Sequence, residues 1–210
     1  MNKKKVALIG YGYWGQKLYK YLQHSEDFHL EHVFFRSLKD LSEGKIKREY
    51  GGEFVSSMEL IMGDKTVPNL IIATPVKTHY SLTKQALLNS KNVFVEKPLS
   101  PDPLHCKELL ELANEQNLKL ETDYTFTYSE ALLATQRMVK EGAIGNIESI
   151  SIARKQLGRF LEYDVYTLLG THCLSILDMF TPIKGCNFYP KPLMNNKGVT
   201  TAANIYFEST

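Results

Sequence analysis

Three glycines near the N-terminus have the spacing of a phosphate-binding loop. The segment Gly10-Tyr11-Gly12-Tyr13-Trp14-Gly15 follows an apolar run and precedes an amphipathic stretch, which is the context that the GxGxxG pattern requires. In that setting the first glycine permits a tight turn, the second lets the backbone approach a pyrophosphate, and the third allows close packing of helix on strand. The N–H groups and the positive end of the helix dipole would hold the phosphates. We therefore predict a dinucleotide site that includes Gly10, Gly12, Tyr13, Trp14 and Gly15, the alternative being a plain strand–helix turn.

The residues after the second apolar run indicate which dinucleotide is bound. An NAD site usually offers the ribose an acidic residue about 20 residues beyond the glycines. Here the chain reads Phe35-Arg36-Ser37-Leu38-Lys39. The guanidinium of Arg36 cannot accept hydrogen bonds from a ribose, but it can bind a 2′-phosphate through two N–H groups, and Ser37 could add a hydroxyl. We predict NADP rather than NAD, with Arg36 and Ser37 among its contacts. A solvated arginine at a strand end is the alternative.

The elements that must position these residues follow from an alternation of apolar runs and helix-length amphipathic stretches over residues 1–123. This alternation is typical of βαβ units and a mostly parallel sheet. Six runs give the strand count of a doubly wound nucleotide domain: 6–9, 30–35, 54–55, 69–73, 92–95 and 118–120. Helices are expected at 13–23, 38–50, 79–88 and 102–117. The fold class is therefore α/β, with a Rossmann-type domain over 1–123.

Beyond Asp123 the pattern changes to α+β. We expect a helix at 129–141, a strand at 147–152, a helix near 172–179 and a strand at 202–207. These elements predict a shortened α+β domain with an open sheet over 124–210, serving substrate binding or oligomerisation.

Composition excludes several other classes of function. The formal net charge of +2, with 43% hydrophobic and 23% charged residues, gives no reason to expect nucleic acid or an anionic membrane as a partner. No stretch approaches the roughly 18 apolar residues of a membrane span, and the opening is too short for a signal-peptide core. The three cysteines form no CxxC pair, so we expect neither disulfides nor a zinc site. His29 and His32 are three residues apart but lack Cys or carboxylate partners at ligand spacing, so we expect them to be strand-edge residues and not metal ligands. The chain is expected to be cytoplasmic.

A second group of motifs lies within residues 69–100. It reads Ala73-Thr74-Pro75, then Thr78-His79-Tyr80, then Val95-Glu96-Lys97-Pro98-Leu99. Together with the glycine loop, these motifs closely resemble the Gfo/Idh/MocA oxidoreductases, the family of glucose–fructose oxidoreductase and inositol dehydrogenase. The resemblance continues through 124–128, 142–145 and the segment around His172, and so covers essentially the whole chain. It implies hydride transfer between nicotinamide and a sugar, polyol or sugar-nucleotide carbon.

The resemblance also implies roles for individual residues. Lys97 would lie beside the nicotinamide and the reacting oxygen, while Thr74, Pro75, His79 and Glu96 would line the cofactor cleft. An ammonium group there could stabilise the negative charge that develops on the oxygen, or relay the proton. His172 would be the second catalytic residue. A surface lysine and a core histidine are the alternatives for Lys97 and His172.

The second domain departs from the family pattern. Leu168 stands where relatives carry an aspartate four residues before the histidine, Cys173 replaces another aspartate, and Thr127 replaces an arginine. Asp164 lies eight residues before His172 and could substitute. Three interpretations follow: an active oxidoreductase, a catalytically impaired NADP-binding protein serving as sensor or structural partner, and a truncated product without a function of its own.

Family chains normally continue past the strand at 202–207. Without further strands the sheet would expose an unpaired edge, which invites pairing with another chain. We therefore expect a homo-oligomer through the C-terminal sheet, or else a shortened family member or fragment.

Overall fold

The computed structural model describes residues 3–35, 53–155, 164–194 and 200–208. The chain divides into two compact units, Met1–Asp123 and Tyr124–Thr210. Arg36, Ser37 and the helix expected at 38–50 lie outside the described residues.

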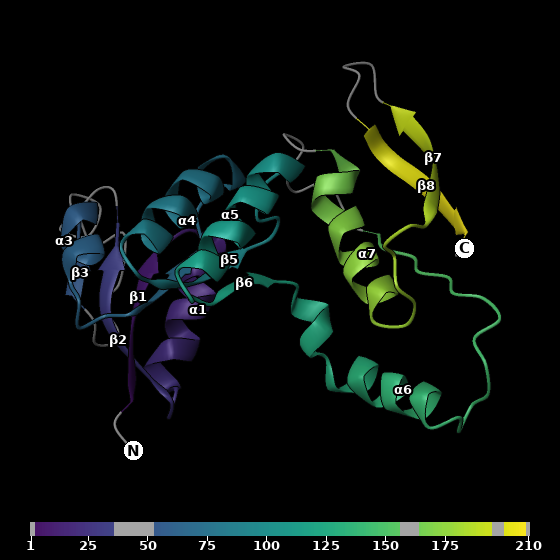
Figure 1. Cartoon of the computed structure of the whole chain (residues 1–210), viewed down its shortest axis with the longest axis horizontal. Coiled ribbons are helices and arrows are strands. Elements are labelled where there is room, and N and C mark those ends of the chain that lie inside the picture. The colour runs from purple at the N-terminus through teal and green to yellow at the C-terminus, as the bar shows by residue number, and fades with distance from the viewer. Residues whose placement is uncertain (1–2, 36–52, 156–163, 195–199, 209–210) are drawn as a thin grey trace. The chain divides into compact units, whose positions relative to one another are not determined.

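The first unit is built on a sheet of six parallel strands, which confirms the predicted fold class (Figure 1). Its order is β3-β2-β1-β4-β5-β6, the doubly wound order of Rossmann domains. The strands are β1 (Lys4–Ile9), β2 (Phe28–Phe34), β3 (Glu53–Val55), β4 (Asn69–Ile72), β5 (Asn92–Glu96) and β6 (Leu120–Asp123).

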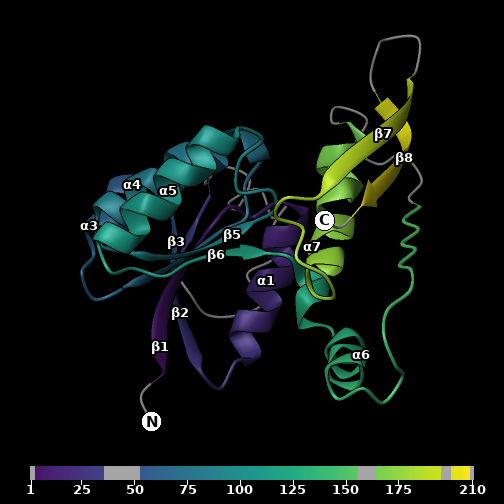
Figure 2. The same ribbon diagram turned by 45° about the vertical axis from the view of Figure 1, so that its right-hand side comes forward.

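Helices cover both faces of this sheet (Figures 1 and 2). Helix α1 (Tyr13–His24) lies on one face, and α4 (His79–Leu88) and α5 (Pro103–Glu115) lie on the other. A short helix, α3 (Met58–Gly63), contributes Ile61 and Met62 to the core beneath α4 and α5.

Residues 6–9 of strand β1 show why this part of the strand is apolar at every position. Val6 and Leu8 pack with Tyr19 and Leu22 of α1, whereas Ala7 and Ile9 belong to the core on the opposite face. Because successive side chains of a strand point to opposite faces, a strand covered on both sides has no polar position.

In its described residues, the second unit consists of short helices and one pair of antiparallel strands. Its helical elements are η2 (Thr125–Tyr128), α6 (Glu130–Lys140), a π-helical turn η3 (Tyr166–Gly170) and α7 (Thr171–Asp178). Strands β7 (Asn187–Met194) and β8 (Thr200–Glu208) pair antiparallel. The predicted α+β character of this part is confirmed.

Two sequence predictions in this unit were wrong. The segment 147–152, predicted as a strand from its alternating isoleucines and serines, has no strand among the described residues to pair with and forms no ladder. Conversely, β7 was missed because Pro190 and Pro192 argue against a strand. A two-stranded sheet consists of edges only, so positions without an N–H are tolerated there.

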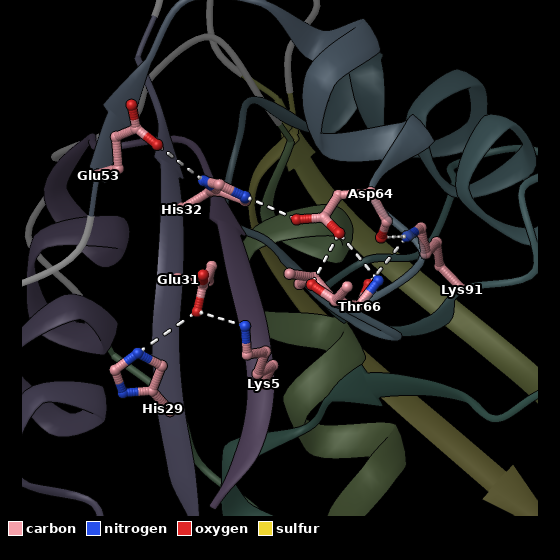
Figure 3. Close-up of polar contacts among 9 residues, drawn as sticks. Lys5, His29, Glu31, His32, Glu53, Asp64, Thr66 and Lys91 are labelled. Atoms are coloured by element: carbon pink, nitrogen blue, oxygen red, sulfur yellow. Dashed lines mark hydrogen bonds and ion pairs between the residues drawn. The ribbon is translucent and has the colours of Figure 1, made fainter.

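The histidine pair of β2 also differs from expectation (Figure 3). The ring of His29 is exposed and contacts Glu31, as expected for a residue at the margin of the sheet. The side chain of His32 is 9% exposed and lies between Glu53 of β3, 3.6 Å away, and Asp64, 3.1 Å away. Describing His32 as a strand-edge residue was therefore wrong, since β3 pairs with β2 at this position.

Candidate functional site

The predicted site residues of the first unit lie on loops that leave the carboxyl edge of the sheet. The strand order reverses between β1 and β4, and open α/β sheets bind ligands outside the carboxyl ends of the strands at such a point. Residue pairing places Ile9 beside Ile72, and Ile72 beside Val95, at the ends of β1, β4 and β5. The glycine loop, the Ala73-Thr74-Pro75 loop and the Glu96-Lys97-Pro98 loop thus start side by side.

The glycine loop shows a distinct requirement at each glycine. Gly10 has a φ of +103°, and a Cβ there would lie 2.5 Å from the carbonyl oxygen of Ala73 and 2.9 Å from the Thr74 methyl group. A Cβ at Gly15 would overlap the carbonyl group of Gly10. At Gly12 a Cβ would meet no atom of the described residues within 4 Å. Gly10 and Gly15 are therefore required by the fold, whereas Gly12 leaves space beside the loop.

Gly12 is also the N-cap residue of α1. It brings no side chain to the N–H groups of the first turn, and that turn carries no acidic residue. Oriented backbone donors beside an open position suit a pyrophosphate.

The two aromatic residues of the loop begin α1 and are partly exposed. Tyr13 is 44% exposed and Trp14 is 49% exposed, and their rings meet edge to face with centroids 5.1 Å apart. The ammonium of Lys17 lies 4.7 Å from the centroid of each ring. Tyr11, by contrast, packs inward against Tyr19.

The loop after β4 is held by side chain to backbone hydrogen bonds. The Thr78 hydroxyl lies 2.7 Å from the Thr74 hydroxyl and 2.8 Å from the carbonyl oxygen of Pro75. His79 is 1% exposed, and its ring nitrogens contact the carbonyl oxygens of Thr74 and Pro98. The His79 ring therefore contacts the backbone of two loops, the one after β4 and the one that carries Lys97.

Carboxyl groups gather at the ends of β5 and β6. Glu96 ends β5 and is paired in register with Asp123, which ends β6. Burial, and after it the charge of Asp123, raises the pKa of Glu96 to about 7, although the neighbouring Lys97 ammonium acts in the opposite direction. Sequence reasoning did not identify Asp123 as a neighbour of Glu96. Its position at the carboxyl end of the last parallel strand was the available signal.

Lys97 directly follows β5 and precedes a cis peptide bond to Pro98. It therefore leaves the sheet at the edge where the glycine loop and the Thr74 loop also leave it.

In the second unit, His172 is the second residue of α7. Its ring and the Phe126 ring are nearly perpendicular, with centroids 5.0 Å apart, and the guanidinium carbon of Arg154 lies 4.4 Å from the centroid of the same Phe126 ring. Burial raises the pKa of the neighbouring Cys173 thiol, and Arg154 partly opposes this shift.

Asp164 has a local role in the turn before α7. Its carboxylate accepts a hydrogen bond of 2.8 Å from the N–H of Thr167, and its carbonyl accepts one of 3.1 Å from Leu168. These contacts start the turn and account for the aspartate at this position.

Of the helices that the structure describes, none combines the length and the apolar character needed to cross a bilayer. Within the same residues, no three His, Cys, Asp or Glu side chains gather as a metal site would require.

Comparison with known proteins places this site in context. The family model described as "Oxidoreductase family, NAD-binding Rossmann fold" matches residues 4–124. The dTDP-3,4-didehydro-2,6-dideoxy-alpha-D-glucose 3-reductase of Streptomyces violaceoruber is 32% identical over 102 residues, 49% of this chain and 30% of that protein. The scyllo-inositol 2-dehydrogenase (NADP(+)) of Bacillus subtilis is 24% identical over 150 residues, 71% of this chain and 41% of that protein.

Solved structures share the fold. An oxidoreductase of Bacillus cereus superposes with a TM-score of 0.76 at 24% identity, covering 98% of this chain and 60% of that one. The alignments with the first curated relatives span about 40% of the length of those proteins. With the family model matching the whole Rossmann unit, the chain belongs to the Gfo/Idh/MocA family of oxidoreductases with an NAD-binding Rossmann fold.

Proposed function

We propose that the protein is an NADP-dependent oxidoreductase that transfers a hydride between nicotinamide and a hydroxyl-bearing or carbonyl carbon of a sugar, polyol or sugar nucleotide. The observation that carries this proposal is the start of three motif-bearing loops at one edge of the sheet, where its strand order reverses. The names of two relatives, a sugar-nucleotide reductase and an NADP-dependent inositol dehydrogenase, support this substrate class.

The first unit has a cradle that fits a dinucleotide. The open position beside Gly12 leaves room for a pyrophosphate, which the backbone N–H groups at the start of α1 would bind. Thr74 and Pro75, on the loop after β4, and Glu96, at the end of β5, would border the nicotinamide half. When bound, the cofactor supplies or accepts the hydride.

Lys97 is the residue that we assign to the reacting oxygen. Reduction of a carbonyl builds negative charge on oxygen, and an ammonium group placed there stabilises that charge and can donate the proton. In the second unit His172 remains our candidate for a second proton donor. With Leu168 in place of an aspartate and Asp164 engaged with Thr167, we expect its contribution to be the smaller one.

The first test is fluorescence titration of the whole chain with NADPH and with NADH, followed by turnover assays on a panel of sugars, polyols and sugar nucleotides. Lys97→Ala should lower kcat by at least about 100-fold while changing the Kd of NADPH less than about threefold. Lys119→Ala, an exposed lysine that precedes β6 at the opposite edge of the sheet, is the matched control and should leave both quantities unchanged. A parallel loss of binding and turnover in Lys97→Ala would contradict the assigned role.

The choice of cofactor is tested separately. Arg36→Ala should weaken NADPH binding about tenfold or more, because hydrogen bonds to a charged phosphate are lost, and should leave NADH binding nearly unchanged. An equal loss for both cofactors would reject Arg36 as the residue that binds the 2′-phosphate.

A further inference from the structure

An arginine and the candidate proton donor of the second unit contact the same aromatic ring. Arg154 is exposed, and its guanidinium carbon lies over Phe126 at 4.4 Å from the ring centroid. The His172 ring is nearly perpendicular to the Phe126 ring, with centroids 5.0 Å apart. Phe126 belongs to η2, His172 to α7, and Arg154 to the segment between α6 and η3. Folding of the second unit therefore brings a positive charge from a third segment to the neighbourhood of His172.

The charge of Arg154 is not neutralised within the described residues. None of the ion pairs formed there involves Arg154. The Asp164 carboxylate accepts a hydrogen bond from the N–H of Thr167. Burial raises the pKa of the Cys173 thiol, next to His172 in the chain, and the charge of Arg154 opposes that shift. The electrostatic field around the start of α7 therefore includes a positive contribution from Arg154.

The contact with Phe126 suits Arg154 to binding a ligand. Attraction between a cation and an aromatic face uses the delocalised charge and needs none of the five N–H donors of a guanidinium as a hydrogen bond. Contact with the ring also restricts a long side chain, so less rotamer freedom is lost when a ligand binds. The planar fork of N–H groups matches two oxygens of a phosphate or a carboxylate, whereas a hydroxyl offers neither the charge nor the paired oxygens.

We propose that Arg154 is a specificity-determining residue that binds an anionic group of the substrate, a phosphate or a carboxylate, beside His172. The substrate is then a sugar phosphate, a sugar nucleotide or a sugar acid, and a neutral sugar or polyol is a poorer ligand. The consequence for turnover rests on the function proposed above, whereas the binding of the anion does not.

The test is isothermal titration calorimetry of the whole chain, with and without saturating NADPH. The probes are glucose 1-phosphate, glucuronate and glucose, which carry a phosphate, a carboxylate and neither. At least one anionic probe should bind about tenfold or more tightly than glucose. Arg154→Met should weaken that binding by about 10- to 100-fold, because a charged pair of hydrogen bonds is lost, and should leave glucose unaffected. The anionic probe that binds more tightly identifies the phosphate or the carboxylate as the group recognised.

Three comparisons separate recognition from packing. Methionine is neutral and can still cover Phe126, so a packing role alone predicts that Arg154→Met binds the anionic probes as the wild type does. Arg154→Lys keeps the charge and loses the paired geometry, so its loss of affinity should be intermediate. Arg137→Met removes an exposed arginine from the last turn of α6 and should bind all three probes like the wild type. The Kd of NADPH should be the same in every variant.

Similar wild-type affinities for the three probes, no binding of any of them, or unchanged affinity for the anionic probes in Arg154→Met would each overturn the proposal. The proposed function fails separately. If the anionic probes bind through Arg154 but the chain with NADPH turns over no sugar, polyol or sugar nucleotide, the anion site stands and the oxidoreductase activity does not.

Discussion

Among the described carboxyl groups, Asp64 has the most clearly lowered pKa, so its surroundings favour the charged form. The hydrogen bond to the His32 ring, followed by those to the Thr66 hydroxyl and N–H, lowers its pKa from 3.8 to about 2 (Figure 3). Its carbonyl group also accepts a hydrogen bond from the buried ammonium of Lys91. Asp64 thus joins β2 to the segments that precede β4 and β5.

The pH dependence of stability follows from this shift. A carboxyl with a lowered folded-state pKa stabilises the fold above its unfolded value of 3.8, and the effect is lost as pH falls through about 2. Asp64→Asn should reduce the free energy of unfolding by about 1 kcal/mol at neutral pH, with the difference from wild type disappearing below about pH 2. Urea unfolding at a series of pH values measures this. Asp27→Asn, at an exposed position, should have little effect, and a pH-independent difference for Asp64→Asn would be contrary to expectation.

Glu96 shows the opposite behaviour. Burial and Asp123 raise its pKa from 4.5 to about 7, so the fold favours the protonated carboxyl. Relative to the unfolded chain, Glu96 carries no penalty below its unfolded value of 4.5. The destabilisation grows as pH rises from 4.5 to about 7 and is complete above that pH. Glu96→Gln should therefore raise Tm at about pH 8 and leave it nearly unchanged at about pH 4. Thermal unfolding at both pH values tests this, and an equal shift at both would reject the burial explanation.

At the level of single residues, the sequence could identify chemistry that depends on spacing along the chain. Gly10, Gly12 and Gly15 were found because a strand–turn–helix needs them at fixed intervals. Asp123 and the double contact of His79 were not found, because each depends on a partner from a different part of the chain. Pairing in register brings Glu96 to Asp123, and folding brings Pro98 to His79.

Among the elements, the glycine loop allows the strongest test. Within its six residues, we expect one glycine to be needed for folding and another to be needed for cofactor binding. A methyl group at Gly15 would overlap the carbonyl group of Gly10, whereas one at Gly12 would enter open space. Gly15→Ala should lower Tm markedly. Gly12→Ala should retain the wild-type Tm and weaken NADPH binding about tenfold or more, since the added methyl group would occupy the pyrophosphate position. Thermal unfolding and fluorescence titration of both variants provide the comparison. Equal losses of stability would contradict the distinction.

The elements also show which strands can be read from sequence. Strands β1, β4 and β5 lie inside the parallel sheet, and their apolar runs indicate this directly. The segment 147–152 and strand β7 were misjudged because strand formation there depends on a neighbouring strand rather than on composition. Residues 147–152 have the alternation and lack a partner among the described residues, whereas β7 has two prolines and pairs with β8.

For the molecule as a whole, the two units differ in how far they bury their apolar residues. The first unit has a core on each face of its sheet. In the second unit, every residue of β7 is exposed within the described structure. A two-stranded hairpin is at best marginally stable in water, so the hairpin of β7 and β8 needs a further surface to pack against.

One face of this hairpin is suited to pairing with a second copy of the chain. Register places Phe188 opposite Phe207, Pro190 opposite Ile205, and Pro192 opposite Ala203, which makes this face apolar. We propose that it forms the interface of a homo-oligomer, as the sequence led us to expect. Ile205→Lys should then dissociate the assembly, because it places a charge in the apolar interface. Asn204→Lys adds the same charge to the opposite face, since neighbouring residues of a strand alternate, and should leave the assembly intact. Size-exclusion chromatography with light scattering, at several protein concentrations, distinguishes the two variants. A chain that is monomeric at all concentrations, or an equal response of both variants, would mean that something other than a second copy covers the hairpin.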